Sequence, residues 1–338
     1  MPATADPGSR PGPTLTLDTT AVPDPDRSAS PAGYVVEADD GARLHFQDWS
    51  GPAEGAPPLA PVLLIPGFGQ SAWSWAPVAR RIRARVRVVA MDLRGHGLSD
   101  APVDGYDPRS LARDAVAVAE GAGHLDGRAP PVLVGHGFGA NVAAGAAAQL
   151  GPRCGGLVLV DGGWESLAET SELTPEEFVR ALEEPPEVFR SMAAYLADRA
   201  AFDPGSWDED QRRAARETVV ELPSGRLAPA IHPHVRDGVV ASMFEYEPLG
   251  TLGAVEVPVM ALVGADDEAG AHRRSFVATA RALRRAGRPP IASAWFDEGH
   301  NLMRYRPAEV AAVILGAAEV AVGHGWPGSE GSVKRPVR

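Results

Sequence analysis

Residues 132–139 read VLVGHGFG, an apolar run that leads into a turn with three glycines. A run that is apolar at every position is typical of a strand that is covered on both faces. Comparable runs occur at residues 62–65, 86–91, 157–160, 259–263 and 291–296. The segments between them have helical spacing: Leu111, Ala115 and Val118, for example, share one helix face. This alternation predicts an α/β fold, a doubly wound, mostly parallel central sheet flanked by helices.

Four other predicted strands also end in turns that carry polar or glycine residues. Residues 66–71 read PGFGQS, residues 92–99 read DLRGHGLS, residues 264–267 read GADD and residues 298–301 read EGHN. In this order, with GHGFG in the middle, the motifs resemble those of the α/β-hydrolase superfamily over roughly residues 33–320. The resemblance implies an α/β-hydrolase fold with its site at the carboxyl ends of the strands.

The chain departs from this family at the centre of the GHGFG turn. The family carries a nucleophile, usually serine, at the middle of G-x-S-x-G, on a strained turn between strand and helix. That position is Gly137 here. Glycine adopts a positive φ at little cost, but it has no side chain that could attack a substrate. The resemblance therefore implies a vacant nucleophile position.

The base and the acid that the resemblance implies are both present. His300 matches the family's general base, and Asp267 matches the acid that orients this histidine. Asp266 is the neighbouring candidate for the acid, although a carboxylate that caps the turn is the simpler interpretation. Asp161, at the end of another predicted strand, could serve the same role, but we favour a helix or turn cap there.

The oxyanion hole that the resemblance implies consists of backbone N–H groups, which do not depend on side-chain identity. It would be formed by Phe68 and by Phe138, the latter at the start of a predicted helix. Three further polar residues, Asp92, Arg94 and Ser99, are typical of a hydrogen-bonded turn and are not expected to be catalytic. We likewise expect His136 to pack structurally.

The strand–helix alternation stops between residues 163 and 250, where four helix-like segments follow one another. Thr174-Pro-Glu-Glu177 is a capping box that starts one of these helices. We expect an all-helical lid over the carboxyl ends of the strands. Large apolar side chains near the turns and in this insertion predict a substrate pocket for a small apolar molecule, an acyl or aromatic compound, lined by Trp73, Trp164, Met243 and Phe244.

Composition sets the remaining boundaries of the chain. Residues 1–32 and 322–338 lack apolar periodicity, so we expect two disordered tails around a core of residues 33–162 and 251–321. The core opens with residues 34–37 and 43–47, which predict an antiparallel hairpin across Asp40-Gly41.

The chain has 338 residues and a formal net charge of −12, which disfavours nucleic acid as a partner. No apolar run has the length of a membrane span, and the start of the chain lacks a basic segment followed by an apolar one. The single cysteine, Cys154, lies beside an apolar run and is expected to be a core residue in a cytoplasmic protein. His232 and His234 have no carboxylate or cysteine at ligand spacing, so no metal site and no cofactor are expected.

These observations leave three functions open. The first is a hydrolase in which His300 activates water. The second is an enzyme such as a lyase, isomerase or cofactor-free oxygenase that uses His300 as an acid/base catalyst. The third is an inactive binding protein, as in the N-myc downstream-regulated family, which is similar in having glycine at this position. We favour the hydrolase, because the base, the acid and the oxyanion turn match the superfamily's commonest use. Loss of His300 would separate the first two from the third.

Overall fold

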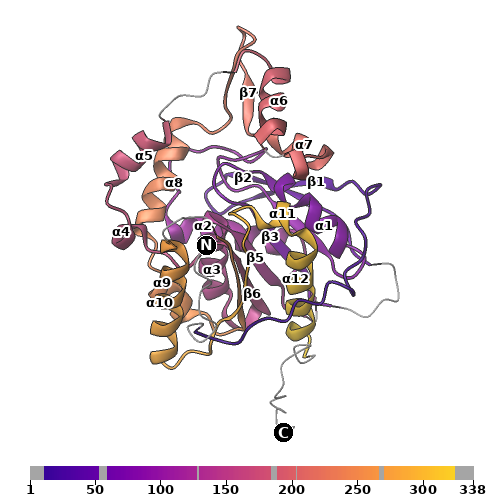
Figure 1. Cartoon of the computed structure of the whole chain (residues 1–338), viewed down its shortest axis with the longest axis vertical. Helices are drawn as coiled ribbons and strands as arrows, with labels where there is room; N and C mark the ends of the chain where they lie inside the picture. Colours follow the sequence, from indigo (N-terminus) through magenta and orange to yellow (C-terminus); the bar gives the residue numbers. More distant parts are fainter. Residues whose placement is uncertain are drawn as a thin grey trace.

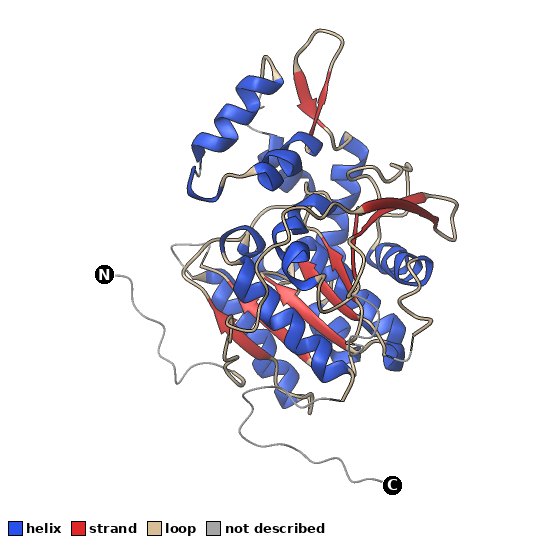
Figure 2. Cartoon of the chain, turned by 90° about the vertical axis from the view of Figure 1, so that its right-hand side faces the viewer, coloured by secondary structure: helices blue, strands red, loops and turns tan. Residues whose placement is uncertain are grey.

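The computed structural model describes residues 11–52, 59–127, 129–183, 189–202, 204–265 and 270–323. Its centre is an eight-stranded sheet in the order β1-β2-β4-β3-β5-β6-β9-β10, which helices cover on both faces (Figures 1 and 2). The strands are β1 (Ala32–Glu37), β2 (Arg43–Asp48), β3 (Val62–Ile65), β4 (Val88–Met91), β5 (Val132–His136), β6 (Gly156–Val160), β9 (Val259–Val263) and β10 (Ala292–Trp295).

The sheet is parallel from β4 to β10 and antiparallel at the edge formed by β1 and β2. This is the α/β-hydrolase architecture that the sequence predicts. The turn between β1 and β2 contains Gly41 at φ 86°, whose N–H donates to the carbonyl of Ala38. The predicted hairpin is therefore confirmed. The carboxyl ends of the parallel strands share one edge, which brings their turns together.

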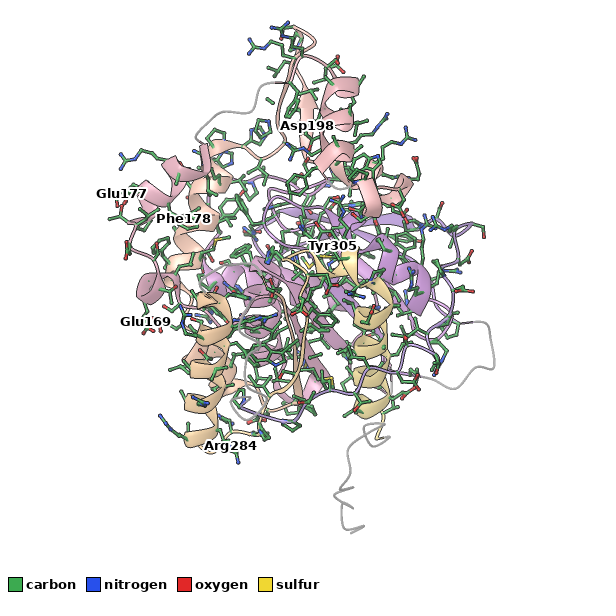
Figure 3. The ribbon with its side chains drawn as sticks, viewed as in Figure 1. Glu169, Glu177, Phe178, Asp198, Arg284 and Tyr305 are labelled. Carbon is green, nitrogen blue, oxygen red and sulfur yellow. The ribbon has the colours of Figure 1, made fainter. Side chains whose placement is uncertain are left out.

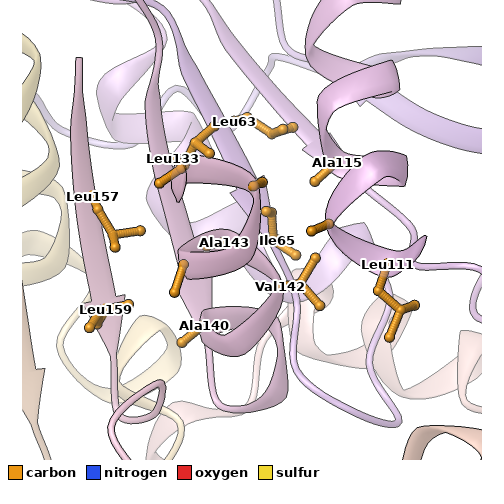
Figure 4. Packing of buried hydrophobic residues seen from close by; sticks show 14 of the residues in the cluster. Leu63, Ile65, Leu111, Ala115, Leu133, Ala140, Val142, Ala143, Leu157 and Leu159 are labelled. Atoms are coloured by element: carbon orange, nitrogen blue, oxygen red, sulfur yellow. The ribbon is translucent and has the colours of Figure 1, made fainter. Parts of the chain in front are cut away.

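Each central strand sends alternate side chains to two separate cores. Leu63 and Ile65 of β3 belong to the core under α2 (Pro108–Gly121), α3 (Phe138–Leu150) and α10 (Ala271–Arg285), part of which is drawn in Figure 4. Val62 and Leu64 face the core under α1 (Ala76–Ile82) and α12 (Pro307–Ala321). All four side chains are fully buried. Each contributes about 1.5–3 kcal/mol, which fixes the sheet that carries the turns.

The N-terminal segment is more ordered than its composition suggests. Thr14 forms a parallel bridge with Ser293, and Leu15 is buried in the core under α1 and α12. Arg80 donates to the backbone carbonyls of Asp26 and Ala29. The prediction of a disordered tail through residue 32 is therefore wrong for residues 11–31, because these specific contacts replace the missing periodicity. Residues 1–10 and 324–338 lie outside the described part of the chain.

The insertion between β6 and β9, which we call the lid, lies over the carboxyl edge of the sheet (Figure 1). Its helices are α4 (Leu167–Thr170), α5 (Pro175–Glu183), α6 (Met192–Phe202), α7 (Glu209–Glu217), α8 (Pro233–Glu245) and α9 (Pro248–Ala254). It also contains an antiparallel hairpin of β7 (Val219–Glu221) and β8 (Leu227–Pro229). The prediction of an all-helical lid is wrong at this hairpin, where Gly225 at φ 77° allows the tight turn.

The capping box at the start of α5 forms as predicted. The N–H of Thr174 donates to Oε2 of Glu177 over 2.9 Å, and the N–H of Glu177 donates to Oγ1 of Thr174 over 3.3 Å. Figure 3 shows Glu177 and Phe178 on this helix at one side of the lid.

Cys154 is a core residue, as expected. Its side chain is buried just before β6, and burial raises the pKa of its thiol to about 11. The thiolate, which is the reactive form, is therefore disfavoured. Separately, no helix among the described residues combines the length and the apolar character needed to cross a membrane.

Candidate active site

The turn between β5 and α3 brings the chain back on itself at Gly137. This residue is the N-cap of α3, with φ 52° and ψ −120°, a conformation that L side chains rarely adopt. Its N–H donates to the carbonyl of Val160 at the end of β6. Two residues later, a Cβ on Gly139 would clash with the carbonyl oxygen of Pro66. Helix α3 therefore packs directly against the turn after β3, and glycine is required for this approach.

His300 faces this turn from the loop that follows β10. Its Nε2 lies 2.8 Å from the point that a Cβ on Gly137 would occupy. Its Nδ1 lies 2.8 Å from Oδ2 of Asp161. The imidazole is thus held on one side by a carboxylate and directed on the other toward Gly137. Its side chain is 45% exposed, so solvent reaches it.

Asp161 is the acid that the structure pairs with His300. It follows β6, is 1% exposed and has φ 48°, an unusual value for a residue other than glycine. Its Oδ1 also accepts from the N–H of Gly264 over 2.6 Å. The prediction of a helix or turn cap missed the contact with His300, which lies 139 residues away in the sequence. Asp267, the residue that we favoured for the acid, and the neighbouring candidate Asp266 lie outside the described residues.

A second histidine, His272, binds the same carboxylate, and the sequence analysis missed it. Its Nε2 lies 3.0 Å from Oδ1 of Asp161, and its Nδ1 lies 3.0 Å from Oε1 of Glu165. Its ring also packs against Trp164, with ring centroids 4.9 Å apart. A histidine in the first turn of α10 has no motif that would connect it with β6, so the sequence contains little that could have identified it.

The charges in this cluster reinforce one another. Burial alone would raise the pKa of Asp161, but hydrogen bonds with His272 and His300 hold it well below its usual range. Burial alone would lower the pKa of His272, but hydrogen bonds with Asp161 and Glu165 and their charges raise it to about 10. Asp161 is therefore a carboxylate and His272 an imidazolium at neutral pH.

His136 packs beneath His300, as expected for a structural residue. It is buried, its ring centroid lies 4.4 Å from that of His300, and its Nε2 lies 3.0 Å from the backbone oxygen of His300. Burial, together with the nearby charge of His300, lowers the pKa of His136 to about 3. A neutral His136 therefore supports the loop that carries His300.

The predicted oxyanion donors lie on two turns that meet near His300. Phe138 is the first residue of α3, so its N–H has no acceptor within the helix. Phe68 belongs to the turn after β3 and packs partly buried against the core. The side chain of Gln70 in the same turn donates to Oδ1 of Asn301 over 2.8 Å. This bond joins the turn of Phe68 to the loop of His300.

Asp92, Arg94 and Ser99 form a hydrogen-bonded turn, as predicted. The hydroxyl of Ser99 donates to the carbonyl of Asp92 over 2.8 Å. The guanidinium of Arg94 is 2% exposed and donates to both oxygens of Asp114. These side chains are occupied by structural contacts after β4.

The four residues predicted to line the substrate pocket occupy other places. Trp73 is buried against Trp49, and Trp164 is buried against Phe276. Met243 packs against the core on the α2 and α3 face. Phe244 stacks edge-on with Phe178, with centroids 5.8 Å apart, inside the lid. The sequence predicts that these four large apolar side chains line a substrate pocket, but in the structure they pack within the lid or the core.

The site instead adjoins a cavity of about 430 Å³, which we call the lid pocket. It lies between α6, α7 and the β7–β8 hairpin on the lid side and, on the core side, the turn after β3 and α11 (Leu302–Tyr305). Its lining includes Gln70, Tyr195, Arg199, Trp207, Asn301 and Arg304. Because Asn301 follows His300 in the sequence, one end of the pocket lies beside the loop that carries His300.

His232 and His234 stack on each other at the start of α8, with ring centroids 5.5 Å apart. In the part of the chain that the structure describes, no group of three or more His, Cys, Asp or Glu side chains is arranged to hold a metal ion.

Comparisons with known proteins agree with this architecture. The chain is 35% identical over 112 residues to epoxide hydrolase 4 of Mus musculus (32% of this chain, 29% of the relative). It is 31% identical over 179 residues to 2-(acetamidomethylene)succinate hydrolase of Mesorhizobium japonicum (52% of this chain, 59% of the relative). The matches thus span less than two thirds of these relatives' lengths.

The fold is also similar to that of a solved structure. The crystal structure of E-2-(acetamidomethylene)succinate hydrolase superposes with a TM-score of 0.67 at 20% identity, over 84% of this chain and 98% of that one. The sequence profile of the alpha/beta hydrolase family matches residues 62–313, which include β3, the Gly137 turn, the lid and His300. The chain belongs to the alpha/beta hydrolase family.

Proposed function

We propose that this chain is a hydrolase that cleaves an ester or related acyl bond of a small molecule and uses water as the nucleophile. The observation that carries the proposal is the position of His300. Its Nδ1 is held by Asp161 over 2.8 Å, and its Nε2 is directed at the space beside Gly137. A base in this position deprotonates whatever occupies that space.

The reaction follows from these positions. His300 Nε2 takes a proton from a water molecule as the water oxygen bonds to the carbonyl carbon of the substrate. The carbonyl oxygen becomes an oxyanion, which the N–H groups of Phe68 and Phe138 stabilise. The imidazolium of His300, stabilised by Asp161, then returns the proton to the leaving group as the acyl bond breaks. Acid and alcohol, or acid and amine, are released, and the base is regenerated.

Gly137 is consistent with water rather than a side chain as the nucleophile. A Cβ at this position would lie 2.8 Å from His300 Nε2, closer than real Cβ atoms approach other atoms, and 3.1 Å from its Cε1, which is a tight contact. A serine would therefore require the imidazole to move. Its absence has a cost in rate: loss of a triad nucleophile removes on the order of 10⁶-fold, and the remaining groups retain about 10³-fold over water. We therefore expect slow turnover or an activated substrate.

The relatives support a hydrolase in general terms. The matched proteins from Mus musculus and Mesorhizobium japonicum are named as an epoxide hydrolase and a succinate-derivative hydrolase. Both names describe bond cleavage by water, although on different functional groups. We extend only this reaction class to the present chain.

The test is hydrolysis of 4-nitrophenyl esters from acetyl to decanoyl by the full chain, beside His300→Gln, Gly137→Ser and a matched control, His232→Gln. We expect turnover that His300→Gln removes and that His232→Gln, an exposed histidine on the lid, leaves unchanged. If the unaltered protein is inert and Gly137→Ser gains activity, the site lacks only its nucleophile and the water mechanism is wrong for these esters.

A second candidate is an acid/base enzyme that removes a proton from carbon or from a hydroxyl group. The observation in its favour is the same close approach of His300 Nε2 to Gly137, since the vacant space admits a substrate atom as readily as water. Such an enzyme would leave the esters intact. It would still exchange an acidic C–H of a bound ligand for deuterium, and His300→Gln would stop that exchange.

A further inference from the structure

The N-terminal segment crosses the molecule before the first strand of the sheet begins. We call residues 11–31 the N-terminal strap. Near one end of the strap, the N–H of Leu15 donates to the carbonyl of Ser293 in the edge strand β10 over 2.8 Å. Near the other end, the N–H of Asp26 donates to the carbonyl of Arg80 in α1 over 3.1 Å. The strap therefore runs from the β10 edge of the sheet to α1, against the core under α1 and α12.

Arg80 joins the strap to the lid through four hydrogen bonds. Its Nη1 donates to the backbone carbonyl of Asp26 over 3.0 Å and to that of Ala29. Its Nε and Nη2 donate to the two carboxylate oxygens of Asp210 in α7, over 2.9 and 3.1 Å. A planar guanidinium matches a carboxylate in this two-bonded geometry, which fixes the orientation of both groups. Strap, α1 and α7 therefore meet at one side chain.

The pair between Arg80 and Asp210 is shielded from solvent. Each side chain is 11% exposed, and the guanidinium carbon of Arg80 lies 5.1 Å from the ring centre of the buried Trp49. Breaking a shielded pair leaves a charge without a partner away from water, so such a pair opens less readily than an exposed one. By contrast, the strap residue Arg27 lies 3.9 Å from Asp208 and is 73% exposed, so this second pair adds little.

The same face of α7 contacts the core at further points. The guanidinium carbon of Arg213 lies 3.6 Å from the ring centre of Trp73, which is a cation–π contact. Ala214 packs against the core under α1 and α12. Asp210, Arg213 and Ala214 are three and four residues apart, so they lie on one face of the helix. Helix α7 is therefore held against the core along this face.

The neighbouring face of α7 forms a wall of the lid pocket. Gln211, Ala215 and Thr218 follow the spacing of one helix face, and all three line this cavity. Ser71 and Ser74, from the segment after β3, line it from the core. Because the two walls belong to different parts of the molecule, the distance between α7 and the core sets the width of the pocket. The contacts that hold α7 therefore limit what the pocket can contain.

We propose that Arg80 is a positioning residue for specificity: held by the N-terminal strap, it fixes α7 as a wall of the lid pocket and so limits the length of the acyl group that the site accepts. This inference rests on the proposed function, because it assigns the substrate size of the same site. It also gives the strap a role in the reaction, although the strap contributes no residue to the pocket.

The first test needs no turnover and uses the full chain. Hydrogen–deuterium exchange, followed by mass spectrometry, measures how often the backbone amides of α7 open. Arg80→Gln and Asp210→Asn should each raise the exchange rate of these amides about tenfold, because α7 loses its shielded pair, while the amides of β5 keep their protection. Unchanged exchange in α7 would overturn the proposal. An equal rise in α7 and in β5 would also overturn it, since Arg80 would then support stability in general.

Arg83→Gln is the matched control for this test. Arg83 lies at the end of the same helix and binds the strap through Asp26 over 2.7 Å, and its other described contact is with the carbonyl of Trp49. Its loss should leave exchange in α7 unchanged. If Arg80→Gln does not fold because Asp210 is left as a buried charge, the double variant Arg80→Gln/Asp210→Asn removes both charges and gives the same readout.

The second test measures specificity with 4-nitrophenyl esters from acetyl to decanoyl. Asp210→Asn and the double variant should raise the ratio of kcat/KM for the decanoyl ester to that for the butanoyl ester about tenfold, the scale of one or two methylene groups in an apolar pocket. The change should lie in KM of the long esters. Arg83→Gln, and Arg153→Gln, whose exposed side chain pairs with Glu120, should keep the unaltered profile. An identical profile in all variants would overturn the proposal, even if α7 opens more often.

These measurements separate the two proposals. If no form of the protein hydrolyses an ester, the hydrolase is rejected, and calorimetry with hexanamide and decanamide replaces the esters. A preference for decanamide that rises about tenfold in Asp210→Asn would then support the role of Arg80, and an unchanged preference would reject it. If hydrolysis depends on His300 but all variants share one chain-length profile, the hydrolase stands and the role of Arg80 is rejected.

Discussion

Two buried aspartates lie at the carboxyl ends of parallel strands of the same sheet, yet only one of them belongs to the candidate site. Asp92 follows β4 and Asp161 follows β6, and each is 1% exposed. Each holds the Nδ1 of a histidine over 2.8 Å: Asp92 holds that of His45, and Asp161 that of His300. Each also accepts from backbone N–H groups. By residue type and pairing alone, the two turns are alike.

The histidines differ in what surrounds them. The side chain of His45 is 10% exposed, and its Nε2 lies 2.9 Å from the point that a Cβ on Gly33 would occupy, in the edge strand β1. The side chain of His300 is 45% exposed and adjoins Gly137. We call the turn of Asp92 closed, because β1 covers the second ring nitrogen of its histidine. We call the turn of Asp161 open, because the side chain of His300 is exposed. A paired histidine and aspartate therefore mark a candidate site only where the second ring nitrogen can reach a ligand.

The largest expected effect tests this difference directly. Asp161→Asn should lower kcat for any His300-dependent reaction by about 10²–10⁴-fold, because the amide no longer stabilises the imidazolium or fixes its orientation. Asp92→Asn should destabilise its turn, because an amide accepts the same hydrogen bonds less well than a carboxylate. The folded variant should keep a kcat within a few-fold of that of the unaltered protein. Steady-state kinetics on protein whose folding is checked by circular dichroism gives both values.

Equal losses of kcat in the two folded variants would break the comparison. They would indicate that the turn of Asp92 also controls the chemistry, through the contact between its carboxylate and the N–H of Ala72 near the Phe68 turn.

The next largest effect concerns His272, the second histidine that contacts Asp161. Among the described residues, Asp92 contacts one histidine, His45. The pKa of His272 is about 10 in the folded protein and 6.5 in its unperturbed state. Because folding raises this pKa, the ion pair stabilises the protein fully below pH 6.5 and loses its contribution as pH rises toward 10. One proton changes the free energy of unfolding by up to about 1.4 kcal/mol per pH unit in this window.

The measurement is urea unfolding of the unaltered chain and of His272→Gln at pH 6, 8 and 10. The stability difference between them should shrink steadily as pH rises, while Arg153→Gln should stay parallel to the unaltered protein. A constant difference would mean that His272 is not protonated in the folded state.

The sequence predicts the sheet well because its strands are buried on both faces, so apolar runs such as residues 62–65 stand out without knowledge of their neighbours. The lid hairpin was missed because Val219–Glu221 and Leu227–Pro229 are short and partly exposed. Leu15 was missed because a single buried side chain in a proline-rich segment has no periodicity. In each case a long-range contact overrides weak local preference.

The site divides in the same way. His300 and the Gly137 turn were predictable because each belongs to a motif at a strand end. The contact of His300 with Asp161, and the presence of His272 on the same carboxylate, depend on how β6, α10 and the last loop meet in space. The pocket was mispredicted because composition identifies aromatic side chains but not the direction in which each lid helix presents them, as Trp73 and Phe244 illustrate.

The smallest expected effect compares the hydrogen bonds that hold the two turns. The hydroxyl of Tyr246, after α8, donates to the carbonyl of Gly163 over 2.9 Å, two residues beyond Asp161. The hydroxyl of Ser99 donates to the carbonyl of Asp92 over 2.8 Å. Tyr246→Phe removes one hydrogen bond, whereas Ser99→Ala removes two, because the hydroxyl of Ser99 also accepts from the N–H of His45. Each lost bond should lower the free energy of unfolding by about 0.5–1.5 kcal/mol.

Kinetics would make this pair of variants informative. If the buried carboxylate of Asp161 is fixed by its own contacts with Gly264 and His272, Tyr246→Phe should change kcat no more than Ser99→Ala does. A selective loss of kcat in Tyr246→Phe would show instead that the lid, through this one hydroxyl, sets the position of Asp161. The position of Asp161 in the open turn would then depend on the lid, whereas the position of Asp92 in the closed turn would not. The two turns would differ in the contacts that hold the aspartate as well as in the exposure of its histidine.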